Sequence, residues 1–298
     1  MIAKLGAGTY RCRSVGSSVS AALAAGVGWI DTAPNYAQGA AEAHLQLVLD
    51  AHPQVGVSTK VGFVPPSDRQ AAYAAGVLPS GGNERHCLNR SYAAWQLARS
   101  VARLGRAPQL VFVHNPEHGA RDRKSLLWVL SDVFEELESA ADSGLVAGYG
   151  VATWSGLSSG LFTVSELTEV AVKVGGPQHR LRAVQFPLSL VHLSVVAEAL
   201  DGRGSLCEAQ EAGLDVFASA PFGGGALIEL MTTELVRLIA PSASAAQAAL
   251  MVALSAPHVS RVLVSASSPA HWADAVSAAA RAPLSPSHLR KVIDVLGT

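Results

Sequence analysis

The 298-residue chain has few of the features that mark secreted, membrane-spanning or nucleic-acid-binding proteins. Its three cysteines, Cys12, Cys87 and Cys207, lie far apart, which fits neither a disulfide framework nor a metal motif. No run of about 18 apolar residues is present, and residues 1–5 lack the apolar core of a signal peptide. The formal net charge is −1 without a basic cluster. We therefore expect a cytoplasmic protein with no metal, membrane or nucleic-acid partner.

What the chain does have is a regular alternation of short apolar runs and amphipathic segments. Eight apolar runs predict strands, at residues 5–10, 29–31, 55–60, 110–114, 145–151, 181–186, 214–219 and 259–264. The segments between them predict helices, at residues 17–25, 42–49, 90–104, 124–143, 165–174, 194–212, 243–254 and 269–280. Alternating strands and helices are typical of a parallel sheet, and eight pairs predict an α/β fold, a (β/α)₈ barrel forming one domain over residues 1–298. Residues 285–298 are predicted to add a helix outside the barrel count.

Three consecutive predicted strands end on, or just before, a titratable side chain. Asp31, Lys60 and His114 hold these positions, and Tyr36 follows Asp31 after a proline that ends regular structure. The carboxyl ends of barrel strands meet at one face, where the catalytic residues of such barrels lie. A phenol is a weak acid at neutral pH, and a neighbouring ammonium is expected to lower its pKa. The spacing therefore predicts a proton donor, Tyr36, supported by an amine, a carboxylate and an imidazole.

One long irregular segment, residues 62–88, follows the third strand. It contains residues that oppose regular structure, namely Pro65, Pro66, Pro79, Gly81 and Gly82. Long loops inside compact domains are usually functional or mobile. We interpret the segment as an active-site insertion that encloses a substrate; a surface insertion without function is the alternative. Trp29, Trp154 and Phe222 are candidates to shape the substrate pocket, although Trp29 and Phe222 fit a plain core position equally well.

Short motifs along nearly the whole chain resemble those of the aldo-keto reductases. They are Gly8-Thr9-Tyr10, Asp31-Thr32-Ala33-Pro34-Asn35-Tyr36, Ser58-Thr59-Lys60, Val113-His114-Asn115-Pro116-Glu117, Gly150-Val151, Val184-Gln185 and Ser219-Ala220-Pro221. The resemblance implies that Asp31, Tyr36, Lys60 and His114 form the catalytic tetrad, with Tyr36 as general acid/base. It also implies hydride transfer between a nicotinamide cofactor and a small-molecule carbonyl or alcohol.

The same resemblance implies where the cofactor, NADP or NAD, would be bound. The residues concerned are Thr9, Tyr10, Asp31, Thr153, Gln185, Ser219, Pro221, Phe222, Ser265, Ser267 and His271. Several depart from the family pattern. His271 stands where many members have an arginine, and imidazole is mostly neutral at pH 7. A phosphate is usually bound by Arg or Lys, so selectivity for NADPH is in doubt, although hydroxyls and amides near residue 268 could bind an anion.

These departures leave two other functions open beside the reductase. One is a redox-neutral lyase, isomerase or cyclase that uses the same tetrad with a weakened or lost cofactor site. The other is a nucleotide-sensing binding module, against which the intact Tyr36 and Lys60 argue. The sequence does not identify the substrate, because pockets on this fold vary with their loops.

Overall fold

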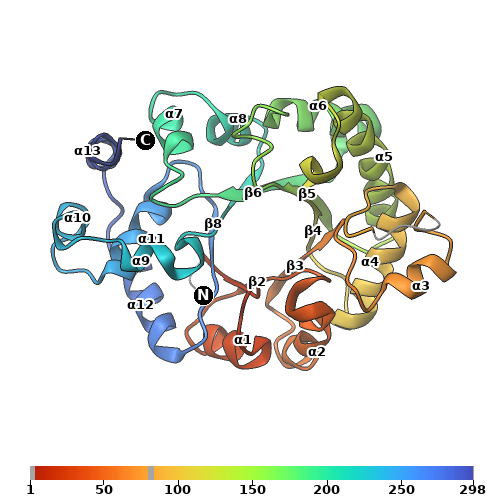
Figure 1. The fold of residues 1–298 in the computed structure, drawn as a ribbon, viewed down its shortest axis with the longest axis horizontal. Coiled ribbons are helices and arrows are strands. Elements are labelled where there is room, and N and C mark those ends of the chain that lie inside the picture. Colours follow the sequence, from red (N-terminus) through yellow and green to blue (C-terminus); the bar gives the residue numbers. More distant parts are fainter. Residues whose placement is uncertain (1–3, 80–83, 298) are drawn as a thin grey trace.

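The strands of the computed structural model, which describes residues 4–79 and 84–297, close into a parallel barrel surrounded by helices (Figure 1). The strands are β1 (Leu5–Gly8), β2 (Trp29–Asp31), β3 (Gly56–Val61), β4 (Leu110–His114), β5 (Gly148–Ala152), β6 (Leu181–Pro187), β7 (Asp215–Ser219) and β8 (Arg261–Val264). They pair in sequence order, and β1 closes the ring by pairing with β8. The predicted (β/α)₈ fold is confirmed. Residues 1–3 and 298 of the predicted domain lie outside the described residues.

About half of the described helices begin at a side chain that caps the first turn. They are α1 (Val15–Ala24), α2 (Ala41–Ala51), α3 (Arg69–Ala74), α4 (Arg90–Leu104), α5 (Arg123–Asp142), α6 (Val164–Gly175), α7 (Ser194–Leu200), α8 (Ser205–Glu211), α9 (Ala226–Glu229), α10 (Thr233–Ile239), α11 (Ala245–Ser255), α12 (Pro269–Ala279) and α13 (Pro286–Leu296). Capping boxes begin α5 at Asp122, α6 at Thr163 and α11 at Ser244. Such a box satisfies two backbone amides that no helical bond can reach. Gly105, with a φ of 72°, ends α4 in a left-handed cap.

The structure differs from the predicted secondary structure in two places, and it adds two helices where none was predicted. Residues 194–212 form two helices instead of one, because Gly202 and Gly204 both have positive φ and break the segment. The segment 62–88 contains a short helix, α3, and its Phe63 pairs with His86 in an antiparallel bridge; its residues 80–83, including Gly81 and Gly82, lie outside the described part. Two short helices, α9 and α10, occupy the connection before α11.

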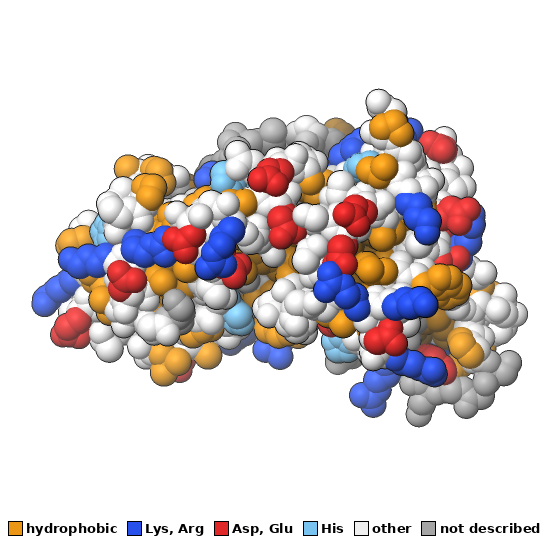
Figure 2. All heavy atoms as spheres, turned by 90° about the horizontal axis from the view of Figure 1, so that it is seen from above, with side chains coloured by type: hydrophobic (Ala, Val, Ile, Leu, Met, Phe, Trp, Pro, Cys, Tyr) orange, Lys and Arg blue, Asp and Glu red, His pale blue; other side chains and the backbone are white. Residues whose placement is uncertain are grey.

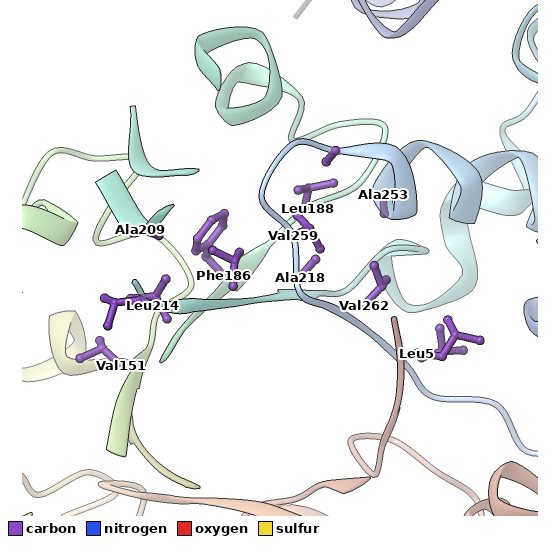
Figure 3. Packing of buried hydrophobic residues seen from close by; sticks show 14 of the residues in the cluster. Leu5, Val151, Phe186, Leu188, Ala209, Leu214, Ala218, Ala253, Val259 and Val262 are labelled. Carbon is purple, nitrogen blue, oxygen red and sulfur yellow. The ribbon is translucent and has the colours of Figure 1, made fainter. Parts of the chain in front are cut away.

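Apolar side chains fill the space between the barrel strands and the outer helices. Figure 3 shows part of this layer, in which Val151, Phe186, Ala218 and Val262 from the strands face Ala253 and other helical residues. A smaller cluster fills the barrel interior, where Trp29 packs against Phe217 and the Arg261 guanidinium. Trp29 is therefore a core residue and not part of the substrate pocket. Because both sides of each strand are covered, the strands are mostly apolar, and the polar side chains inside them, such as Ser58 and Thr59 of β3, are hydrogen-bonded.

The surface carries mixed charge. On the face drawn in Figure 2, basic and acidic side chains are interspersed. Among the described residues, no helix combines the length and the apolarity needed to cross a bilayer.

Candidate active site

A buried ion pair joins the ends of β2 and β3. Lys60 Nζ lies 2.6 Å from Asp31 Oδ2 and also donates to the backbone oxygen of Thr32 at 2.9 Å. The Lys60 side chain is 2% exposed and that of Asp31 is 6% exposed. Burial disfavours the ammonium, but Asp31 and Tyr36 more than offset it, so the pKa of Lys60 lies above its ordinary value. Lys60 is therefore a fixed positive charge at neutral pH.

A second polar contact holds the other oxygen of the carboxylate. Ser58 Oγ donates to Asp31 Oδ1 at 2.7 Å, and Trp29 Nε1 donates to Ser58 Oγ at 3.1 Å. Ser58 and Lys60 point to the same side of β3 because they are two residues apart. Asp31 thus accepts one bond at each oxygen, which fixes the orientation of its carboxylate.

Tyr36 lies over this ion pair. It begins a short 3-10 helix, η1 (Tyr36–Gly39), and its ring centroid is 5.0 Å from Lys60 Nζ and 5.1 Å from the Tyr10 ring centroid. Burial raises the pKa of the Tyr36 phenol above its ordinary value, while Lys60 acts in the opposite direction. Lys60 therefore lowers the pKa of Tyr36 as expected, but the loss of water outweighs the neighbouring charge, so the net shift is upward.

His114 completes the group from the end of β4. Its ring lies edge-on to Tyr36, with 6.0 Å between ring centroids, and 4.7 Å from the Phe63 ring. Burial, and then the Lys60 charge, lower the pKa of His114 well below its ordinary value, so the ring is neutral at pH 7. The structure therefore brings Asp31, Tyr36, Lys60 and His114 to one place at the carboxyl ends of β2 to β4.

Asp31, Tyr36 and His114 line a cavity of about 900 Å³ at the mouth of the barrel, and Lys60 lies behind them, outside its lining. Of the residues predicted to bind a cofactor, all but one line it: Tyr10, Asp31, Thr153, Gln185, Ser219, Pro221, Phe222, Ser265, Ser267 and His271. The exception is Thr9, whose hydroxyl is buried and bonded to Thr32 Oγ1 at 2.9 Å. Thr9 therefore does not line the cavity but holds Thr32, the residue that directly follows β2. Trp154 also lines the cavity, as does Phe63 from the 62–88 segment.

Three residues of this wall have polar side-chain atoms without a hydrogen-bond partner. Within the described part of the chain, the buried atoms concerned are Asn35 Oδ1, His114 Nδ1 and Gln185 Nε2. Buried polar atoms are normally paired, so these three side chains are candidates to bind a polar ligand. An elongated ligand with an amide group at one end, such as a nicotinamide dinucleotide, fits the size of the cavity and the Gln185 position.

Three residues that support this site were not assigned a role by sequence reasoning. Ser58 is one of them. Glu117 Oε1 accepts bonds from Thr153 Oγ1 at 2.8 Å, Trp154 N at 2.8 Å and Ser155 N at 3.0 Å, which fixes the loop after β5. His86 Nε2 lies 2.8 Å from the backbone oxygen of His114. Ser58 and Glu117 lie inside motifs already singled out, whereas nothing in the sequence indicated His86.

Comparisons with known proteins agree with this architecture. A family model described as the Aldo/keto reductase family matches residues 4–296. A search of curated protein sequences found no match.

Similar solved structures include an aldo-keto reductase from Klebsiella pneumoniae in complex with NADPH (18% identity, TM-score 0.70, covering 98% of this chain and 90% of that one). A glycerol dehydrogenase from Gluconobacter oxydans gives a TM-score of 0.72 at 18% identity, with 98% and 91% covered. The holo form of an aldo-keto reductase from Bacillus halodurans gives 0.68 at 18% identity, with 97% and 91% covered. At this identity the likeness shows the fold alone.

Proposed function

Because the chain belongs to the aldo/keto reductase family, we propose that it is an oxidoreductase that interconverts a carbonyl compound and the corresponding alcohol. The observation that carries the proposal is the convergence of Asp31, Tyr36, Lys60 and His114, from the ends of β2 to β4, beside one cavity that all of them but Lys60 line. A bound nicotinamide dinucleotide would supply the hydride for reduction or accept it for oxidation. The NADPH complex of the similar Klebsiella pneumoniae structure supports a cofactor of this class.

Tyr36 is the general acid in the direction of reduction. Its raised pKa keeps the phenol protonated at neutral pH, so a proton is available for the oxygen of the substrate. The positive charge of Lys60, 5.0 Å from the ring centroid, stabilises the phenolate that remains after the proton has left. In the direction of oxidation the same phenolate takes the proton of the alcohol.

Asp31 and His114 have supporting roles. Asp31 keeps Lys60 charged and in place through the 2.6 Å contact. His114 is neutral, so one ring nitrogen can donate a hydrogen bond to the substrate oxygen without competing with Tyr36 for the proton. For His114 and Tyr36 to reach the substrate oxygen, the substrate must enter the cavity next to Tyr36. Phe63 and Trp154 are among the apolar residues that line the cavity.

The cofactor would lie along the carboxyl ends of the strands. Gln185, with its unpaired Nε2, is the residue we assign to the carboxamide. The rest of the cofactor would lie against residues at or after the ends of β7 and β8, together with Tyr10 and Thr153. Those at or after the end of β7 are Ser219, Pro221 and Phe222, and those after β8 are Ser265, Ser267 and His271. The Thr153 hydroxyl already donates to Glu117 and accepts from Gly156 N, so Thr153 contributes mainly shape.

Titration and a single substitution test the proposal. We expect NADH or NADPH to quench the fluorescence of the purified protein at micromolar concentration. Tyr36→Phe is expected to lower kcat for a test aldehyde by about 10²- to 10⁴-fold, the usual contribution of a general acid, without weakening cofactor binding. Tyr73→Phe, which removes a phenol outside the cavity, is the matched control.

These two experiments distinguish the reductase from the redox-neutral enzyme and from the nucleotide-sensing module. Absence of binding of either dinucleotide at millimolar concentration would overturn the reductase, and would favour redox-neutral chemistry at the same tetrad. Binding without any Tyr36-dependent turnover would instead favour a nucleotide-sensing module.

A further inference from the structure

We propose that this cavity selects NAD(H) over NADP(H), because its charged and hydrogen-bonding groups do not provide for a 2′-phosphate. The inference rests on the proposed function, since it concerns the dinucleotide that the reductase would use. Two observations carry it: the charges that line the cavity, and the hydrogen bonds already made at the start of α12.

The cavity is poor in fixed positive charge. Among its lining residues, taken over the described part of the chain, Arg11 is the one Arg or Lys. Lys60 does not line the cavity, and its charge is matched by Asp31 at 2.6 Å. His114 is neutral at pH 7 because burial lowers its pKa. A dinucleotide therefore meets a single guanidinium.

Arg11 is placed to meet a phosphate that both dinucleotides share. Its guanidinium carbon lies 5.2 Å from the centroid of the Tyr10 ring, and a Cβ atom placed on Gly224 would lie 3.4 Å from Arg11 Nη1. Arg11 thus reaches from the β1 exit to the glycine-rich loop after β7. NAD and NADP share a pyrophosphate, and the 2′-phosphate of NADP adds nearly two further negative charges at pH 7. One guanidinium does not neutralise both groups.

The start of α12 is where a helix would otherwise bind a phosphate, because free amides and the helix dipole favour an anion there. Here those amides are mostly used or absent. Pro269 has no N–H, and the N–H of His271 is bonded to the capping Ser268 hydroxyl at 3.2 Å. The N–H of Trp272 is bonded to the Ser268 backbone oxygen, also at 3.2 Å. In this first turn, Pro269–Trp272, the N–H of Ala270 is the one that takes part in neither of these bonds.

An acidic side chain adds repulsion at the same place. Asp274, one turn into α12, lines the cavity and accepts a hydrogen bond from Gln247 Nε2 at 2.9 Å. A carboxylate near a dianionic phosphate is unfavourable, whereas a carboxylate is a good acceptor for a ribose hydroxyl, as in NAD-binding sites of other folds. The hydroxyls of Ser265 and Ser267, in the same wall, can bond to a sugar or to a phosphate, but they carry no charge that would neutralise a phosphate dianion.

Equilibrium binding measures the preference without relying on turnover. We expect isothermal titration calorimetry to give a Kd for NADH at least tenfold lower than that for NADPH. NADPH binding as tightly as NADH, or more tightly, would overturn the inference and leave the proposed function standing. Binding of neither would overturn the proposed function and the inference together.

A charge substitution tests the cause. His271→Arg places a guanidinium beside the start of α12 and is expected to lower the ratio of the NADPH Kd to the NADH Kd about tenfold. The matched control is His44→Arg, an identical exchange on the exposed side of α2, outside the cavity, which is expected to leave the ratio unchanged. An unchanged ratio in His271→Arg, or an equal change in His44→Arg, would refute the explanation by local charge.

Discussion

Replacing Lys60 by methionine tests whether the ion pair between β2 and β3 is as tightly coupled as its geometry indicates. The substitution keeps the length of the side chain and removes the ammonium, which donates to Asp31 Oδ2 at 2.6 Å and to Thr32 O at 2.9 Å. Asp31 then remains as a buried carboxylate with one hydrogen bond, from Ser58 at 2.7 Å. An unpaired buried charge is strongly unfavourable, because protein surrounds it in place of water.

The expected loss of stability follows from this geometry. Removing one partner of a buried ion pair usually costs about 3–5 kcal/mol, and Ser58 is expected to keep the loss near the lower end. The double variant Asp31→Asn/Lys60→Met removes both charges, so its loss is expected to be smaller than that of the single variant by about 2 kcal/mol or more. The double variant is therefore more stable than Lys60→Met although it carries one substitution more.

Urea unfolding at pH 7.5, followed by circular dichroism, measures the three free energies of unfolding from the midpoint and slope of each curve. A loss below about 1 kcal/mol for Lys60→Met, the range of exposed ion pairs, would refute the reasoning. So would a double variant that is less stable than the single one, since it would show that the Asp31 charge is not the source of the loss.

Three further predictions concern residues around the site. Ser58→Ala removes the donor to Asp31 and is expected to lower the free energy of unfolding by about 1–3 kcal/mol, measured by urea unfolding. Gly150→Ala places a Cβ atom 2.7 Å from Phe112 Cε1 and against backbone of β6, so overpacking is expected to lower the free energy of unfolding by about 1–3 kcal/mol, measured by urea unfolding. His114 has a depressed pKa, so its contribution to stability is complete above about pH 6.5 and falls by about 1.4 kcal/mol per pH unit below it; His114→Gln is expected to lose less stability between pH 7 and 5.

Each of these predictions has a control. Gly16→Ala, in α1, introduces a Cβ atom with no other atom within 4 Å and is expected to be neutral or stabilising. Ser287→Ala, on exposed α13, is the control for Ser58→Ala. If the wild-type protein and His114→Gln lost equal stability between pH 7 and 5, the conclusion that His114 is buried in its neutral form would be refuted.

The side chains of the candidate active site show what sequence patterns can and cannot predict. Asp31, Lys60 and His114 could be located from the sequence because apolar strands leave charge only where they emerge, and Tyr36 because Pro34 ends the strand before it. The direction of the Tyr36 pKa could not be predicted, because it depends on how deeply the phenol is buried relative to its distance from Lys60. His86 was missed because its contact with the His114 backbone joins residues 28 positions apart.

By itself the sequence determined the alternation of eight strands and helices, and so the barrel. Hydrophobic periodicity, helix caps and apolar runs are local properties of the sequence, which do not depend on contacts between distant residues. It also determined which residue types stand at the strand ends. Only the tertiary structure decided which of them share a cavity, how Arg11 and Asp274 distribute charge around it, and which amides at the start of α12 are already bonded. These depend on distances between segments that closure of the barrel brings together.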